Sequence, residues 1–427
     1  MVGRRERAAL AGASVALGAA IGWGAWLAHH GAAILLSGAQ PLMGPLGVHV
    51  GPATAACVVF GVAAAWWLPG VMARLRWPKM LVTAAAVTAV WSVLLALVPG
   101  VHDGLIKPII ARDSYLSDVH AWHGALLAHF IDRIPVGAPG QWATHVGGHP
   151  PGALLSFWAL DRVGLGAPGF AAALCIAGGA AAVPAVLVSV RVLAGDGPAR
   201  ALAPYLCLLP IAVWIAVSPD AYFAGIAGWG VALLAIAGNH RGWRGAIPAL
   251  AGGLLLGWAL LLSYGLVLIA PVAVAVVLVQ RRFWPLVVAA LPVALVVAGF
   301  AWGGFWWWHG LRVTEQRVHD GRAGARPYGY FVLADAAVAV IALGPAVIAG
   351  ATRIRRPLGW IVGAAATAVA LAAVSGLARG EVERIWLPFY PWLAVAAAGL
   401  IGRRPGGWLG AQIGVAIVVQ TVIVGHW

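Results

Sequence analysis

Charged side chains are scarce in this sequence: they make up 9% of its 427 residues, whereas hydrophobic residues make up 62%. An ordinary soluble domain is about a quarter charged, so this composition excludes a water-soluble globular protein. Cysteine is scarce too, because Cys57, Cys175 and Cys207 are the whole set and all lie in apolar stretches. Their spacing fits neither a disulfide framework nor a cysteine-based metal motif, and we interpret them as small core residues.

Ten-residue segments that alternate apolar and polar residues are also missing, which argues against a transmembrane β-barrel. The sequence instead holds long apolar runs, and each run of about 20 residues can cross ~30 Å of hydrocarbon as a helix. We therefore predict an all-α, polytopic transmembrane helical bundle with about 13 spans. The predicted spans are residues 8–27, 52–70, 80–98, 168–190, 200–218, 220–238, 246–263, 265–280, 284–303, 330–350, 358–376, 386–402 and 408–425.

The predicted spans form a single membrane domain over residues 1–427. The first apolar stretch is too long for a signal peptide and lacks a cleavable small-residue pattern, so we interpret it as a retained span. The parts of the domain are two additional N-terminal spans (1–79), a central module (80–402) with long outer loops at 101–167 and 303–330, and a C-terminal span (403–427).

The net charge of +14 would suggest nucleic-acid binding in a soluble protein, but its distribution indicates a topology instead. Seventeen of the 27 basic residues, and only Glu6 and Asp196 among the 13 acidic ones, fall on alternate loops beginning with the N-terminus. The positive-inside rule makes these loops cytoplasmic. Membrane lipids are then expected partners and nucleic acid is not. Lysine occurs only at Lys79 and Lys107, which is typical of a GC-rich bacterial genome. We therefore predict that the protein resides in a bacterial cell membrane.

The first long outer loop carries an acidic segment beginning at Asp113. Its apolar residues recur at helical spacing, which predicts an amphipathic helix lying in the membrane interface. Asp113 stands where a helix N-cap belongs, a role compatible with a chemical one. The apolar positions are Tyr115, Val119, Trp122, Leu126 and Phe130.

A prolyl turn, HPPG at 149–152, follows in the same loop. His145 and His149 are four residues apart, but Gly147 and Gly148 between them argue against the helical face that a zinc pair uses. A histidine that donates to a phosphate at a helix start is the chemically simpler interpretation.

Two later outer segments are rich in arginine. The guanidinium groups of Arg326 and the neighbouring arginines could bind phosphate oxygens in pairs. The alternative is that they only balance the charges of nearby acidic residues. Arg379, Glu381, Glu383 and Arg384 gather at the outer end of one span, where charges either pair or mark a site.

The order of these motifs resembles the GT-C superfamily of integral membrane glycosyltransferases, in particular actinobacterial members related to protein mannosyltransferases and aminoarabinose transferases. The resemblance rests on Asp113, Ser114 and Tyr115, on the prolyl turn, on SPDAYF at 218–223 and on ERIWLPFYP at 383–391. It spans residues 80 to 392. The family's acidic loop usually follows the first span, whereas here it follows the third, so two spans precede the matched module.

The resemblance implies an enzyme that moves a hexosyl or pentosyl group from a polyprenyl-phosphate-linked sugar to a cell-envelope glycan, lipid or protein on the outer side of the membrane. Direct in-line attack would invert the anomeric centre. It also implies roles for individual residues: Asp113 as the base, Asp118 as a supporting carboxylate, and His149 and Arg384 as the groups that hold the donor phosphate. We add Tyr115, Arg326 and Glu383 to the predicted substrate-binding set.

No cofactor other than the lipid-linked donor is expected with certainty, and a divalent metal stays undecided. Asp113 and Asp118 offer oxygen ligands, but five residues apart on a helix they diverge by more than a right angle. We therefore assign no metal ligands from the sequence.

Two other classes of function stay open. A lipid-linked glycan transporter or flippase would be expected to show internal repeats and polar or broken helices near the midplane, and we find no repeat in the sequence. A non-catalytic membrane scaffold would place no special demand on Asp113.

Overall fold

The computed structural model describes residues 3–423, and this part of the chain is helical throughout apart from loops and an isolated bridge between Leu46 and Ile423. The expected polytopic helical bundle is confirmed. Within the described residues nine helices are long and apolar enough to cross a membrane. They are α1 (Arg4–His29), α2 (Pro52–Arg74), α3 (Trp77–Ala96), α8 (Pro168–Ala194), α10 (Pro219–Gly238), α11 (Trp243–Leu262), α13 (Trp284–Trp302), α15 (Tyr328–Ala351) and α16 (Leu358–Ser375).

The four remaining predicted spans are shorter or broken helices. Proline contributes to one break, because Pro210 begins the second of two short helices within the span predicted at 200–218. The segments are α9 (Asp196–Cys207) with η4 (Pro210–Trp214), η5 (Tyr264–Ile269) with α12 (Ala270–Gln280), α18 (Tyr390–Leu393) with η6 (Ala394–Leu400), and α19 (Gly406–Val422). Each of the thirteen predicted spans therefore has a helical counterpart within residues 3–423, and the last two residues of the span predicted at 408–425 lie outside the described part of the chain.

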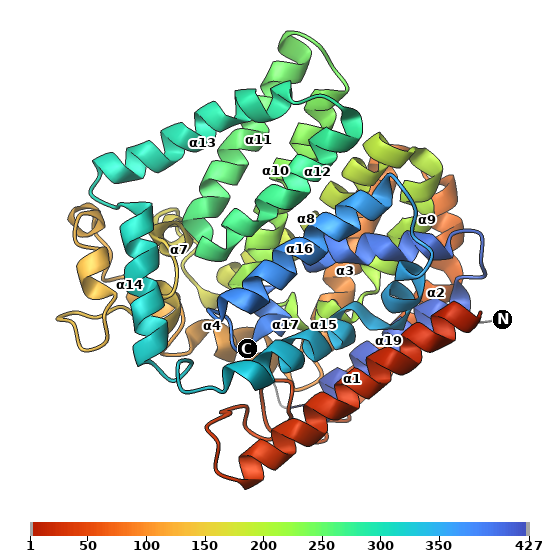
Figure 1. The fold of residues 1–427 in the computed structure, drawn as a ribbon, viewed down its shortest axis with the longest axis horizontal. Helices are drawn as coiled ribbons and strands as arrows, with labels where there is room; N and C mark the ends of the chain where they lie inside the picture. The colour runs from red at the N-terminus through yellow and green to blue at the C-terminus, as the bar shows by residue number, and fades with distance from the viewer. Residues whose placement is uncertain (1–2, 424–427) are drawn as a thin grey trace.

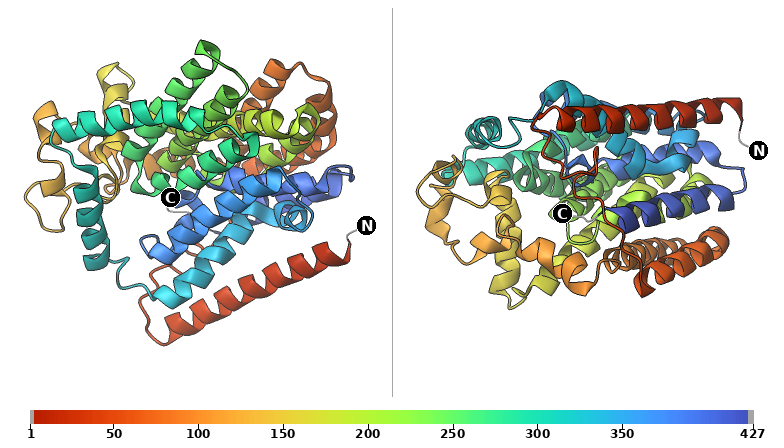
Figure 2. Two further views of the ribbon diagram at one scale, coloured as in Figure 1. Left: turned by 45° about the horizontal axis from the view of Figure 1, so that its top comes forward. Right: turned by 90° about the horizontal axis from the view of Figure 1, so that it is seen from below.

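The centre of the bundle is built from α8 and α10, which pack against each other, with α11 on the far side of α10 and α13 outside α11 (Figure 1). Helix α1 lies along α15 at the edge of the molecule, as Figure 2 also shows. Few residues of α1 and α13 are buried. Their exposed apolar faces suit contact with lipid hydrocarbon.

Contacts between loops follow the predicted sidedness. The buried Glu6 pairs with Arg353 and, at 3.0 Å, with Arg403. Arg200 donates to the carbonyl of Leu75 at 2.7 Å. All five residues belong to segments that the sequence assigns to the cytoplasmic side. Each contact therefore joins residues of one predicted side, and which side is cytoplasmic stays a prediction.

The interfacial helix predicted from Asp113 onward is wrong as a continuous helix. His123 takes an extended backbone conformation (φ −143°, ψ 155°) immediately before Gly124, which divides the segment. The apolar face is nevertheless buried at four of its five predicted positions, Leu126 being only partly buried. The outer loops contain η1 (His102–Ile106), α4 (Lys107–Ile110), α5 (Leu116–Val119), η2 (Gly124–Leu127), η3 (Ile131–Arg133), α6 (Thr144–Gly147), α7 (Pro151–Arg162), α14 (Trp307–Asp320) and α17 (Val382–Ile385).

A kink divides α15 at Gly344, whose φ of 73° lies in the left-handed region. The break leaves backbone groups without helical partners, and the buried side chain of Gln412 on α19 supplies them. Its Nε2 donates to the Leu343 carbonyl at 2.9 Å, and its Oε1 accepts from the Ala346 N–H at 3.4 Å. Gln412 thus ties α19 to the kink.

We expect Gln412→Ala to lower the thermal stability of the detergent-solubilised protein. The variant strands two buried backbone groups, and each costs about 1–3 kcal/mol. Gln316→Ala is the matched control, because Gln316 is exposed and bonds only to the neighbouring turn. Equal melting temperatures for the two variants would contradict this account of the kink.

Candidate active site

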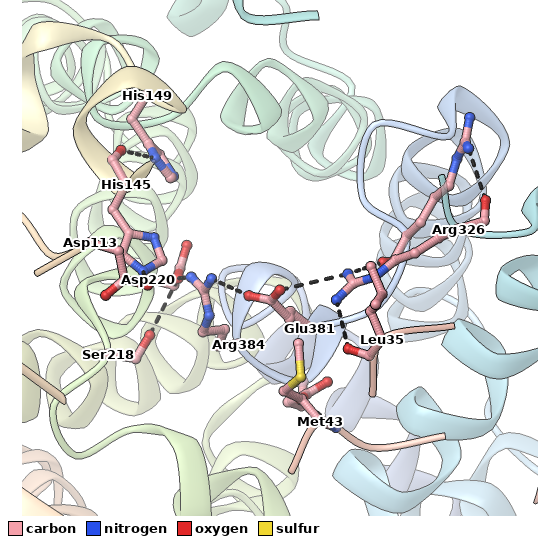
Figure 3. A network of polar contacts seen from close by, with 12 residues as sticks. Leu35, Met43, Asp113, His145, His149, Ser218, Asp220, Arg326, Glu381 and Arg384 are labelled. Atoms are coloured by element: carbon pink, nitrogen blue, oxygen red, sulfur yellow. Dashed lines mark hydrogen bonds and ion pairs between the residues drawn. The ribbon is translucent and has the colours of Figure 1, made fainter. Parts of the chain in front are cut away.

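A largely buried network of ion pairs lies where several of the predicted outer segments meet, and Arg384 of α17 is at its centre (Figure 3). Arg384 Nη1 lies 3.2 Å from Asp220 Oδ2, and Nη2 lies 2.5 Å from Glu381 Oε2. Arg326 extends the network, because its Nη1 lies 3.6 Å from Glu381 Oε1. We call Asp220, Arg326, Glu381 and Arg384 the Arg384 cluster.

Asp220 owes its position to the start of α10. Pro219 occupies the first helical turn, for which its fixed φ is suited, and Asp220 follows it in that turn. A carboxylate is favoured there by the helix dipole. Ser218 Oγ also donates to Asp220 Oδ2 at 3.3 Å. The start of α10 and the Ser218 hydroxyl therefore position the Asp220 carboxylate, in addition to its ion pair with Arg384.

Glu381 is positioned by a tight turn after α16. Gly380 has φ 84°, and Glu381 itself has φ 62°, a left-handed conformation that is uncommon for a residue with a side chain. The turn leads directly into α17, so Glu381 and Arg384 face each other. Backbone strain of this kind is typical of functional sites.

The charges of the cluster stabilise one another against burial. Burial by itself would raise the pKa of Glu381, but the guanidinium groups of Arg384 and Arg326 hold that pKa below its ordinary value. Burial would lower the pKa of Arg384, and the carboxylates of Glu381 and Asp220 raise it instead. Arg384 therefore remains a cation, paired on two sides.

Two histidines adjoin Arg384 in the outer loop that carries Asp113. The His145 N–H donates to the Asp113 carbonyl at 2.9 Å, and His149 Nδ1 is 2.8 Å from the His145 carbonyl. Burial, followed by the positive charge of Arg384, lowers the pKa of His145; burial also lowers that of His149. Both rings are neutral near pH 7. His149 Nδ1–H then donates to the carbonyl, so its Nε2 is the unprotonated ring nitrogen.

The structure brings Asp113, His149 and Arg384 together from distant parts of the chain (Figure 3). The Asp113 side chain is 58% exposed, and its Oδ2 lies 3.9 Å from His145 Nε2. Asp113 is thus the solvent-accessible carboxylate of the site, whereas Arg384 is less accessible, with 14% of its side chain exposed. The roles assigned to these three residues stay predictions.

Three further predicted residues form the buried support of this site. The ring of Tyr115 packs against those of His145, His149 and Phe157. Glu383 Oε1 accepts the Met43 N–H at 3.3 Å. Tyr115, Glu383 and Arg326 are all buried, so any contact of theirs with substrate would need movement of the surrounding chain.

Asp118 contacts a different part of the outer loop. Its Oδ2 accepts the Ala143 N–H at 2.8 Å, and its charged neighbours are Arg133 and Arg317. Burial raises its pKa above the ordinary value, although the Ala143 bond and the arginines oppose that shift. The observed contacts of Asp118 hold the segment leading to His145. Its predicted catalytic role is untested.

The sequence prediction omitted Asp220, Glu381 and His145 from the site. Asp220 had a usable signal, since it follows a Ser-Pro pair at an outer turn between two predicted spans. Its pairing with Arg384, 164 residues away, has no local signal. Within residues 3–423 no group of three or more histidine, cysteine, aspartate or glutamate side chains is placed to hold a metal ion.

The buried Glu383 predicts a specific pH dependence of stability. Burial raises its pKa from 4.5 to about 7. The folded state then binds the proton more tightly than the unfolded state, so this residue's contribution to stability falls as the pH rises from about 4.5 through 7. The titratable and charged neighbours of Glu383 include Glu381, Arg384 and Asp335.

We expect Glu383→Gln, which mimics the protonated acid, to gain melting temperature relative to the parent protein as the pH is raised from 5 to 8. The exposed Glu315 supplies the control variant Glu315→Gln. A difference between Glu383→Gln and the parent that does not change with pH would show that Glu383 does not titrate in this range.

Comparison with known proteins identifies a solved structure with a similar fold. The sequence matches no protein-family model and no curated protein. The structure is similar to a crystal structure of the Archaeoglobus fulgidus oligosaccharyltransferase in complex with Zn and sulfate, with a TM-score of 0.50 and 15% sequence identity. The match covers 80% of this chain and 53% of that protein, so this chain spans about half its length. At this identity the similarity is one of fold, and it supports the GT-C resemblance drawn from the sequence.

Proposed function

We propose that this protein is a membrane glycosyltransferase that transfers a sugar from a polyprenyl-phosphate donor to a cell-envelope acceptor on the outer side of a bacterial cell membrane. The observation that carries the proposal is the gathering of Asp113, His149 and Arg384 at one site in a GT-C fold. An exposed carboxylate, Asp113, and a largely buried cation, Arg384, both lie near His145 there, and sugar transfer from a lipid phosphate requires a base and a cation of this kind.

The chemistry divides between these residues. The acceptor hydroxyl oxygen bonds to the anomeric carbon of the sugar while the bond from that carbon to the phosphate oxygen breaks. The hydroxyl proton passes to Asp113, and the electron pair of the broken bond leaves with the lipid phosphate. A positioned base and a cation that meets the developing charge each lower the barrier of such a displacement. A single displacement inverts the anomeric centre.

Arg384 has donors to spare for the leaving phosphate. A guanidinium group has five N–H donors, and Asp220 and Glu381 each engage one terminal nitrogen. These carboxylates fix the plane of the fork, so the other N–H groups have a set direction. In neutral His149 the Nδ1–H already donates to the His145 carbonyl, so the free Nε2 would accept from a hydroxyl of the sugar rather than donate to the phosphate as the sequence predicted.

The predicted topology supports an outer location for the site. Leu35, Asp113, Asp220, Arg326 and Arg384 belong to segments that the basic-residue distribution assigns to the outside. Their mutual contacts support one shared side. Donor and acceptor would then meet at the outer leaflet.

We expect Asp113→Asn to abolish sugar transfer while leaving expression and melting temperature close to those of the parent, because the amide has nearly the same shape but is a far weaker base. The assay is release of polyprenyl phosphate from a panel of hexosyl and pentosyl polyprenyl phosphates by protein in nanodiscs, with total envelope lipids and glycans as acceptors. Asp132→Asn, an exposed acid in the same loop, should retain activity. Full activity of Asp113→Asn would remove the assigned base.

Arg384→Ala is expected to raise the KM for the donor at least about tenfold, the effect of losing one hydrogen bond to a charged group, with little change in the KM for the acceptor. Arg312→Ala, at an exposed arginine, is the control. Equal losses for donor and acceptor would indicate a structural role. Donor that crosses the vesicle bilayer without being cleaved would identify a flippase instead.

A further inference from the structure

The loop between α1 and α2, residues 30–51, reaches the Arg384 cluster. We propose that this N-terminal outer loop is a positioning element of the donor site, which sets the orientation of Arg384 through Arg326 and the turn at Gly380. The part of this claim that concerns donor binding rests on the proposed function. The spans that precede the matched module would thereby acquire a role in the reaction.

Two backbone groups of the loop bind side chains of the site. The Leu35 carbonyl accepts from Arg326 Nη2 at 3.3 Å, and the Met43 N–H donates to Glu383 Oε1 at 3.3 Å. Figure 3 shows Leu35 and Met43 on the side of Glu381 away from the histidines. The loop therefore contacts Arg326 of the Arg384 cluster and also Glu383, which follows Glu381 by two residues.

The loop also packs directly on that turn. Leu36 is fully buried together with Tyr330 and Phe331 of α15. A Cβ at Gly380 would lie 3.3 Å from Leu36 Cδ2 and 3.2 Å from Arg326 Nη1. Because Gly380 immediately precedes Glu381, the side chain of Leu36 limits where the Glu381 carboxylate stands.

The loop has the rigidity that a positioning element needs. Its own hydrogen bonds close it, with the Gly44 N–H donating to the Leu36 carbonyl and the Ala39 N–H to the Gly44 carbonyl, both at 3.0 Å. Leu35 and Ser37 have φ of 54° and 63°. Non-glycine residues persist in this conformation only where the surroundings determine it. The fold of the loop therefore determines the direction in which the Leu35 carbonyl points.

A sequence of contacts links the loop to the cation of the site. The Leu35 carbonyl holds one nitrogen of Arg326, and Arg326 pairs with Glu381. Glu381 in turn holds one nitrogen of Arg384. Loosening the loop frees Glu381 to move, and the Arg384 fork then loses one of its two fixed partners.

The test uses Leu36→Ala in the full chain. The variant opens a cavity beside Gly380 without removing a polar group of the site. Leu409→Ala is the matched control, because Leu409 is an equally buried leucine on α19 and the two truncations carry comparable costs in stability. Farnesyl phosphate is the binding probe, with the protein in nanodiscs.

We expect Leu36→Ala to weaken farnesyl phosphate binding about tenfold, the effect of one lost hydrogen bond to a charged group, and Leu409→Ala to leave it unchanged. In an Arg384→Ala background Leu36→Ala should have no further effect, because it acts through Arg384. Additive effects, or equal losses for the two leucine variants, would overturn the inference.

Amide hydrogen exchange tests the same claim without a ligand. Leu36→Ala should speed exchange across residues 380–386, and Leu409→Ala should not; equal exchange in the two variants would overturn the inference. Failure of the parent protein to bind farnesyl phosphate would contradict the proposed function, and exchange would then decide the role of the loop alone. If Leu36→Ala does not fold, Arg326→Lys takes its place, since lysine keeps the charge but loses the fork that reaches the Leu35 carbonyl.

Discussion

The paired burial of Arg384 between Asp220 and Glu381 is the constraint on which the site depends. A guanidinium group taken out of water costs several kcal/mol unless carboxylates and hydrogen bonds compensate for it. Here the compensation comes from the start of α10 and from the turn before α17. Neither segment can move far without stranding a charge, so the network holds the outer ends of these elements in one arrangement.

Because of this constraint, different side chains of the site are suited to stabilise the leaving phosphate and to take the acceptor proton. The cation is buried and fixed from two sides, whereas the carboxylate of Asp113 stands exposed at the rim beside His145. The two neighbouring histidines stay neutral, because burial and the charge of Arg384 disfavour a second cation. A fixed cation suits the stabilisation of a leaving anion, and an accessible carboxylate suits contact with an acceptor that arrives from outside.

The sequence predicted the spans well because each apolar run is read independently of the others. It also predicted that Asp113, His149 and Arg384 share a side, because sidedness depends only on span order and basic loops. It failed where an interaction joins distant residues: Asp220 and Arg384 have no signal that links them. The continuous outer helix was wrong because the helical spacing ignores the extended backbone at His123. The contacts of the Leu35 carbonyl and the Met43 N–H could not be predicted, because every residue has a backbone carbonyl and all except proline have a backbone N–H.

The most direct measurement is photo-crosslinking of the protein in nanodiscs with a polyprenyl phosphate that carries a diazirine beside the phosphate, followed by peptide mapping. The account predicts labels in the outer segments that meet at Arg384, within residues 113–157, 218–223 and 376–390. Labels confined to the lipid-facing surface of α13, or to the opposite end of the bundle around Glu6 and Arg353, would contradict a lipid-phosphate site at Arg384.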